Sequence, residues 1–238
     1  MLWLHLQPQK LPQGLWEEMK LRNTPIRGRL LSSGEEVTSV ELLSSRKTGC
    51  SRTNQLSVVI AEHDLNVDDT EQVHSLSRVI MHENYNGNGA GFPNDIALLR
   101  VSEPMRLTSK AATIEIPTPG MEFLGNNNCY ITGWGLTQGS QDRTVLQELK
   151  VDVRTKSACK RAWGNSYIND GHICVENGNT GACNGDSGGP LACLVNGQWY
   201  LAGATSWGIS GCTTRGYPSV YTRISYFSEW VRENMMTK

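Results

Sequence analysis

The sequence predicts an all-β protein, an antiparallel barrel or a sandwich, that ends in one helix. Glycine accounts for 24 of the 238 residues, which is typical of short strands joined by tight turns. Short apolar runs recur between turn-rich stretches, for example the one at 84–94. The length allows one large all-β domain or two small ones, with ample material for a buried core.

Clear strand patterns begin at residue 58. Apolar or alternating runs predict strands at 58–60, 73–81, 96–101, 129–133, 146–153, 191–194, 199–204 and 220–222. The C-terminal segment is predicted to be a helix because its apolar residues follow the spacing i, i+3, i+6, i+7 (Ile224, Phe227, Trp230 and Val231). Residues 1–49 are polar and weakly patterned, and only a hairpin within 30–43 is suggested there.

Composition excludes several classes of function. The net charge of −1 argues against a nucleic-acid-binding protein and against a protein held on an anionic membrane. No apolar run approaches the roughly 18 residues that a membrane helix needs. Seven Trp, seven Tyr and balanced charge argue against a disordered chain.

The cysteines favour structural disulfides in an oxidising compartment. Seven are dispersed along the chain, no C-x-x-C pair occurs and only five His are present, so a zinc site is improbable. Six lie in the second half and could pair in fifteen ways, while Cys50 is alone in the first half. No signal peptide is readable, because the apolar start of the chain is shorter than the roughly 7–15 residues of a signal core.

The most specific motif is Gly-Asp-Ser-Gly-Gly-Pro at 185–190, between Cys183 and Cys193. A serine between glycines lies on a turn that can expose its hydroxyl. The same turn can direct the amides of Gly185 and Ser187 to one point, as an oxyanion hole requires. The alternative is a glycine-rich turn without chemistry.

Five stretches share the order and spacing of the chymotrypsin-like serine proteases, and they lie at 94–99, 129–135, 185–190, 206–208 and 218–223. From Cys50 to its end, the chain therefore resembles this trypsin-fold family, and is most similar to pancreatic elastase and chymotrypsin. The resemblance implies two antiparallel six-stranded β-barrels with a C-terminal helix. It places the first barrel at about 50–115 and the second at about 120–238, and leaves 1–49 as a non-family segment.

The resemblance also implies roles for individual residues. Ser187 would be the nucleophile, with Gly185 and Ser187 supplying the oxyanion hole. Asp95 would orient the catalytic base, and Asp186 would pair with a new N-terminal amine after zymogen cleavage. Ser206 would support Asp95, and Ser206, Trp207 and Gly208 would form the edge along which a substrate strand adds. The implied disulfides are Cys129–Cys193, Cys159–Cys174 and Cys183–Cys212.

By the same resemblance, the specificity pocket carries no charge. Gly181 stands where trypsin-type members hold an aspartate, so a buried Arg or Lys would lack its counter-charge. Gly208 leaves the pocket mouth open and Ser219 shortens its back wall. We therefore expect cleavage after uncharged, medium-to-large residues (Leu, Met, Phe and Tyr).

A second, weaker site is a loop that resembles the calcium loop of these proteases. It contains Glu62, Asp64, Asp69 and Glu71, and clustered carboxylates suit a hard, oxygen-ligated cation. The alternative is a solvated acidic loop. Apart from this structural calcium, the family requires no cofactor.

The family pattern breaks in the first 50 residues. The catalytic histidine should precede Cys50, but Gly49 stands there, and no Ile-Val-Gly-Gly activation motif occurs. His63, His82 and His172 are expected on surface loops, and His74 in a strand. The loss of early strands predicts that the first barrel is incomplete or irregular, with unpaired edges unless residues 1–49 pair with them.

Two functions follow from this sequence. The first is a secreted, extracellular serine endopeptidase of chymotrypsin- or elastase-like specificity. The second is a catalytically inactive homologue that binds or regulates, because the general base and the activation motif are missing. For either function we expect a monomer whose partners are protein or peptide substrates and protein protease inhibitors, with no nucleic acid and no membrane.

Overall fold

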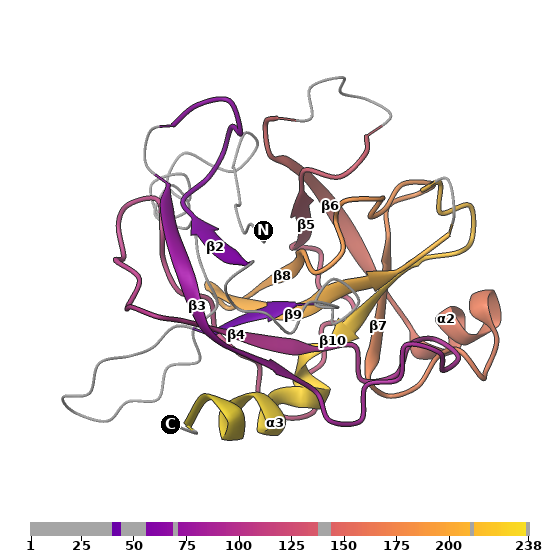
Figure 1. The fold of residues 1–238 in the computed structure, drawn as a ribbon. Helices are drawn as coiled ribbons and strands as arrows, with labels where there is room; N and C mark the ends of the chain where they lie inside the picture. The colour runs from indigo at the N-terminus through magenta and orange to yellow at the C-terminus, as the bar shows by residue number, and fades with distance from the viewer. Residues whose placement is uncertain (1–39, 44–55, 69–70, 138–143, 210–211, 237–238) are drawn as a thin grey trace.

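The first half of the chain forms an open antiparallel sheet. The computed structural model describes residues 40–43, 56–68, 71–137, 144–209 and 212–236. Within them, the sheet has the order β1-β4-β3-β2 (Figure 1). Its strands are β1 (Val40–Leu43), β2 (Ser57–Ile60), β3 (Gln72–Met81) and β4 (Ala97–Val101).

The second half forms a closed antiparallel barrel of six strands in the order β10-β7-β6-β5-β8-β9. The strands are β5 (Cys129–Gly133), β6 (Gln147–Arg154), β7 (His172–Glu176), β8 (Pro190–Val195), β9 (Gln198–Trp207) and β10 (Ser219–Arg223). The helix α2 (Lys156–Trp163) joins β6 to β7, and α3 (Ile224–Met236) follows β10 without a break and runs beneath both halves (Figure 1).

The all-β fold, the six-stranded second barrel and the C-terminal helix are confirmed, but two full barrels are not. Among the described residues, the first half has four strands and does not close. Strand β1 pairs with β4 in register from Val40 opposite Arg100 to Leu43 opposite Ala97. Part of the N-terminal segment therefore covers the edge of β4 that the loss of family strands was expected to leave unpaired.

Strand β4 joins the two halves because both of its faces are buried. Ala97, Leu99 and Val101 pack into the core of the first sheet. Leu98 faces the other way, into a second core that includes Leu201 of β9 and α3. A strand that is buried on both faces reads as a continuous apolar run, which is the pattern of Ile96 to Leu99. The site described below lies at this junction.

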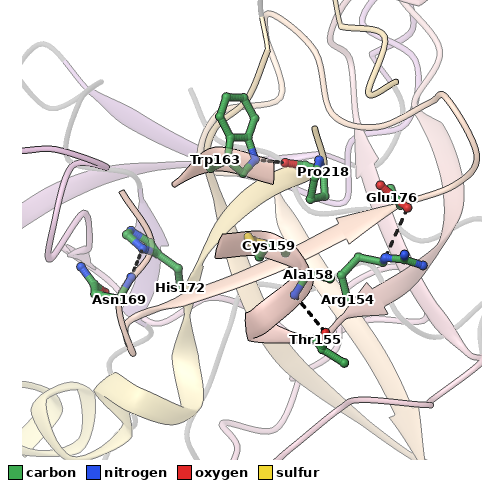
Figure 2. Close-up of a disulfide and its surroundings, with 10 residues drawn as sticks. Arg154, Thr155, Ala158, Cys159, Trp163, Asn169, His172, Glu176 and Pro218 are labelled. Atoms are coloured by element: carbon green, nitrogen blue, oxygen red, sulfur yellow. Dashed lines mark hydrogen bonds and ion pairs between the residues drawn. A yellow bond between two sulfur atoms is a disulfide. The ribbon is translucent and has the colours of Figure 1, made fainter. Parts of the chain in front are cut away.

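Two elements were not predicted. Helix α2 has one buried side chain, Cys159, so its apolar spacing is too sparse to predict a helix. Its start is instead fixed by Thr155, whose hydroxyl accepts a hydrogen bond from the amide of Ala158 at 3.1 Å (Figure 2). Strand β7 begins with His172, which was expected on a surface loop, and its apolar run is short.

Three disulfides cross-link the second half, and they are the three pairs that the family resemblance implied. Cys129–Cys193 joins the paired strands β5 and β8, and Cys159–Cys174 ties α2 to β7. Cys183–Cys212 joins the loop before Ser187 to the loop before β10. Cys50 lies outside the described residues, which also contain no helix long and apolar enough to cross a membrane.

Candidate active site

The segment that carries Ser187 is a tight turn that requires glycine. The amide of Asp186 donates to the carbonyl of Cys183 at 3.0 Å, and the amide of Gly189 donates to the carbonyl of Asp186 at 2.8 Å. Gly185 has a φ of 108°, and a Cβ there would lie 2.8 Å from the Cα of Gly135. Any other residue at 185 would have to displace neighbouring backbone.

Two amides of this turn have no acceptor among the residues that the structure describes. The amides of Asp186, Gly188 and Gly189 each donate to a carbonyl, whereas those of Gly185 and Ser187 donate to none. The Ser187 side chain is partly exposed, and within the same described part of the chain its hydroxyl forms no hydrogen bond. Two unused donors beside an exposed hydroxyl can bind an incoming anionic oxygen.

Asp95 is almost wholly buried, with 1% of its surface exposed, and hydrogen bonds hold it in place. The Ser206 hydroxyl donates to its Oδ2 at 2.5 Å, and the Thr222 hydroxyl donates to its backbone carbonyl at 2.6 Å. The Ser206 hydroxyl therefore orients the Asp95 carboxylate, and the Thr222 hydroxyl fixes the Asp95 backbone.

A short chain of bonds connects Asp95 to the Ser187 turn. Ser206 follows Thr205 in β9, and both the amide and the carbonyl of Thr205 form hydrogen bonds with the turn. The amide of Gly188 donates to the Thr205 carbonyl at 2.8 Å, and the amide of Thr205 donates to the Gly189 carbonyl at 2.8 Å. The structure therefore brings Ser187, Asp95 and Ser206 together, although they are far apart in sequence. Thr205 was not singled out in the sequence, where a β-branched residue within a strand carries no distinctive signal.

The Asp186 carboxylate accepts hydrogen bonds from two backbone amides. Its Oδ1 accepts the amide of Gly135 at 2.9 Å, and its Oδ2 accepts the amide of Cys183 at 2.9 Å. It lines a cavity of about 630 Å³ together with Gly133, Gly135 and Glu148. Burial raises the pKa of Glu148. Asp186 and Glu148 are the acidic side chains among the residues that line this cavity.

The residues expected to form the specificity pocket lie together. A Cβ at Gly181 would lie 2.4 Å from the Ser219 hydroxyl and 2.8 Å from Cγ2 of Thr214, and one at Gly208 would lie 3.9 Å from the Ser219 Cα. The Ser219 hydroxyl accepts the amide of Ala182 at 3.0 Å. Two hydroxyl side chains therefore close the space beside Gly181. Thr214 was not anticipated: it is buried, and its amide donates to the Asn179 carbonyl at 2.8 Å.

Aromatic rings surround Trp207, which ends β9. Trp163 and Tyr217 contact each other at 5.0 Å between centroids, and Trp163 lies 4.7 Å from Trp207. Phe92 and Tyr167 each lie 6.5 Å from Trp207. These T-shaped and tilted contacts fix the indole, whose strand would form one wall of the substrate groove.

Two histidines expected on the surface are largely buried. His172 is 7% exposed and begins β7, where its Nδ1 accepts the amide of Asn169 at 3.2 Å. Burial lowers the pKa of His172 to about 4, although a hydrogen bond with the Gly91 backbone and the Asp95 carboxylate raise it. His82 stacks on Trp230 at 5.0 Å, and burial lowers its pKa. The surface prediction is wrong for both because each ring is covered by aromatic side chains.

The remaining described histidines have their contacts elsewhere. The carbonyl of His63 accepts the amide of Leu146, and His74 pairs with Val58 across β2 and β3. Burial lowers the pKa of His74, against an opposing effect of Glu103. Gly49, at the position expected to hold the base, lies outside the described residues.

The acidic loop after β2 is only partly described, since Asp69 lies outside the described residues. The Glu62 Oε1 accepts the amide of His63 at 2.7 Å, and the Asp64 Oδ1 accepts the amide of Asn66 at 3.0 Å. Within the described part, no three His, Cys, Asp or Glu side chains form a group that could hold a metal ion. Calcium binding by Glu62, Asp64, Asp69 and Glu71 stays a prediction, which the melting temperature with and without calcium would test.

Comparison with known proteins agrees with this geometry. Residues 46–231 match the trypsin family. The chain is 39% identical to Trypsin-1 of Astacus astacus over 75% of each chain. It is 44% identical to a chymotrypsin-like serine proteinase of Haliotis rufescens, over 70% of this chain and 65% of that protein. It is 35% identical to chymotrypsin-like elastase family member 1 of Rattus norvegicus, over 86% of this chain and 76% of that protein.

The fold and the comparisons define the class of protein, a trypsin-like serine protease fold with the Ser187 turn and the buried Asp95 at the junction of two β-structures. The chain belongs to the trypsin family, whose function is proteolysis. A match that covers 86% of the chain is longer than residues 50–238, so the likeness begins before residue 50.

Proposed function

We propose that this protein is a serine endopeptidase that cleaves polypeptides after uncharged, medium-to-large residues. One observation carries the proposal: the unused amides of Gly185 and Ser187 lie in the same turn as the Ser187 hydroxyl, and Thr205 and Ser206 connect that turn to Asp95. In this arrangement Ser187 attacks the peptide carbonyl, and the two amides stabilise the oxyanion that forms.

Asp95 and Asp186 would prepare the site. Asp95, oriented by Ser206, would stabilise the protonated form of the general base that takes the Ser187 proton. Gly49 stands at the position where the family resemblance places that base. Asp186 would hold the oxyanion turn in shape through its bonds to Gly135 and Cys183. An ammonium group bound in the adjacent cavity would neutralise its charge.

Hydrolysis of a panel of tetrapeptide amides that differ only at the residue before the cleaved bond tests the proposal. We expect cleavage after Leu, Met, Phe and Tyr, and loss of cleavage in Ser187→Ala. Preferential cleavage after Arg, or rates unchanged in Ser187→Ala, would contradict it.

The contacts of Gly181 lead to a specificity prediction. Gly181→Asp alone is expected to gain no cleavage after Arg, because its Cβ would lie 2.4 Å from the Ser219 hydroxyl. The double variant Gly181→Asp/Ser219→Gly removes the closer of the two contacts, leaves the one at 2.8 Å from Cγ2 of Thr214, and supplies a carboxylate. It is expected to favour Arg over Leu by about tenfold or more in kcat/KM, since pairing a buried charge offsets several kcal/mol of desolvation. Ser219→Gly alone is the control, and the same Arg preference there would refute the role of residue 181.

The second candidate is an inactive homologue that binds peptides without cleaving them. Its support is the sequence Lys-Thr-Gly-Cys at 47–50, where Gly49 replaces the expected histidine. Loss of one member of a catalytic triad costs on the order of 10⁴–10⁶ in turnover. Saturable binding of the peptide panel without turnover would favour this candidate.

The environment of either form would be extracellular. Disulfides such as the three described here persist in oxidising compartments. The protein would act as a monomer on protein substrates, which add as a strand along Ser206, Trp207 and Gly208. Protein protease inhibitors would occupy the same groove.

A further inference from the structure

The imidazole of His172 is buried beside Trp207, at the end of the strand β9 that is proposed to bind substrate. It begins β7, with 7% of its surface exposed. Its Nδ1 accepts the amide of Asn169 at 3.2 Å, as Figure 2 shows. The backbone of Gly91 lies near the ring. The ring is almost perpendicular to that of Trp207, with 6.1 Å between the centroids and 87° between the planes.

These contacts fix a single protonation state. A ring nitrogen that accepts an amide proton carries none of its own, so the proton of the neutral ring is on the remaining nitrogen, Nε2. Burial keeps the pKa near 4, and the positive charge of Lys156 adds to this effect. At neutral pH, His172 is therefore uncharged, with Nδ1 as a hydrogen-bond acceptor.

Three segments meet beside His172: the turn that contains Gly91, the loop that contains Tyr167, and the end of β9 at Trp207. Gly91 has a φ of 71°, and a Cβ there would lie 1.9 Å from the carbonyl oxygen of Tyr167, so these two backbones are in direct contact. Phe92 follows, and it packs on Trp207 at 6.5 Å. The turn that contains Gly91 leads directly into Asp95, so a displacement here reaches the catalytic carboxylate.

We propose that His172 is a positioning residue that holds the Gly91 turn and the Trp207 ring in the orientation that accepts an extended peptide. This inference rests on the proposed peptide-binding groove. The imidazole suits the role because it accepts a hydrogen bond from the Asn169 amide, lies near the Gly91 backbone and packs perpendicular to the indole. A phenyl ring would fill the same space but would leave the Asn169 amide without its acceptor and place an apolar edge beside the Gly91 backbone, which is unfavourable in a buried site.

The test compares two ligands that differ in reach. Acetyl-Ala-Ala-Pro-Phe, as the free acid, extends along the Trp207 edge, whereas acetyl-Phe occupies only the pocket beside Gly181. In the full chain, we expect His172→Phe to raise the Kd of the long peptide about tenfold and to leave that of acetyl-Phe within about twofold. His172→Gln keeps one donor and one acceptor, and it should bring the long-peptide Kd back to within about threefold of the parent.

His82→Phe is the matched control. His82 is also covered by aromatic rings, and its Nδ1 accepts the amide of Asn84 at 3.1 Å, but it packs on Trp230 rather than on Trp207. Its substitution should change both Kd values equally or not at all. Parallel losses for the two ligands in His172→Phe, or no loss for either, would overturn the positioning role.

Hydrogen exchange without ligand separates this inference from the proposed function. His172→Phe should raise the exchange rates of the amides of Phe92 and Ile96 by about tenfold or more, relative to those of β5 and β8 in the same variant. His172→Gln should restore them. If the parent chain binds neither peptide, the proposed groove is refuted and the exchange rates alone decide the role of His172: rates unchanged in His172→Phe would refute it.

Discussion

Substituting Gly185 with alanine is expected to lower kcat/KM for the cleaved tetrapeptides by about 10²–10³, the cost of losing one oxyanion donor. The φ of 108° is unfavourable for alanine, and the new Cβ would lie 2.8 Å from the Cα of Gly135. Gly135 in turn donates its amide to Asp186 at 2.9 Å. The displacement therefore passes to the residue beside Ser187 and moves both amides that would bind the oxyanion.

Gly125→Ala is the control for this prediction. Gly125 also has a positive φ, 75°, but a Cβ there meets nothing within 4 Å. Alanine at 125 would adopt an unfavourable positive φ but would not collide with a neighbouring atom. Gly125→Ala should therefore lower the melting temperature and leave kcat/KM within about twofold of the parent. A Gly185→Ala variant with parental kcat/KM would show that these amides do not bind the reacting oxygen.

The free energy of unfolding should fall by about 3 kcal/mol on account of His172 as the pH drops from about 6.5 to about 4. The pKa of His172 is lowered in the folded state, from 6.5 to about 4. Between these values the unfolded state binds the proton and the folded state does not. The stabilisation is therefore fully present above pH 6.5 and is lost as the pH falls toward 4. Asp95 opposes the lowered pKa and Lys156 reinforces it.

Denaturant unfolding measured across this pH range, in the parent and in His172→Gln, isolates the contribution. His74 and His82 also have lowered pKa values, so the difference between the two proteins is the informative quantity. The difference should shrink as the pH falls toward 4, because the variant lacks the titrating ring. Parallel curves for the two proteins would contradict the assignment of a buried neutral imidazole.

Elements with strong local patterns were predicted well. The eight predicted strands overlap β2–β6 and β8–β10, and the apolar stripe of 224–231 falls within α3. The disulfide pairs could not be derived from spacing, which left fifteen connectivities, and came from the family resemblance. By contrast, α2 buries a single residue and β7 begins with a histidine, so neither has a pattern that stands out in sequence.

The residues of the candidate site could be predicted where they lie in a recognisable sequence motif. Ser187, Asp95 and Ser206 lie in distinctive stretches, and the structure brings them together through β9. Their catalytic roles stay predictions. The burial of His172 was not predictable, because it depends on the Gly91 turn and Trp207, which lie 81 and 35 residues away in the numbering. Contacts between distant segments leave no local periodicity.

The most direct test of the central claim, that Ser187 is a nucleophile beside an anion-binding turn, is reaction of the full chain with a fluorophosphonate. Attack by the Ser187 oxygen forms a phosphorus–oxygen bond and releases fluoride, and the product can be located by peptide mass spectrometry. We expect one adduct, on Ser187, that is absent from Ser187→Ala and forms much more slowly in Gly185→Ala. No adduct, or an adduct on another residue that persists in Ser187→Ala, would contradict it.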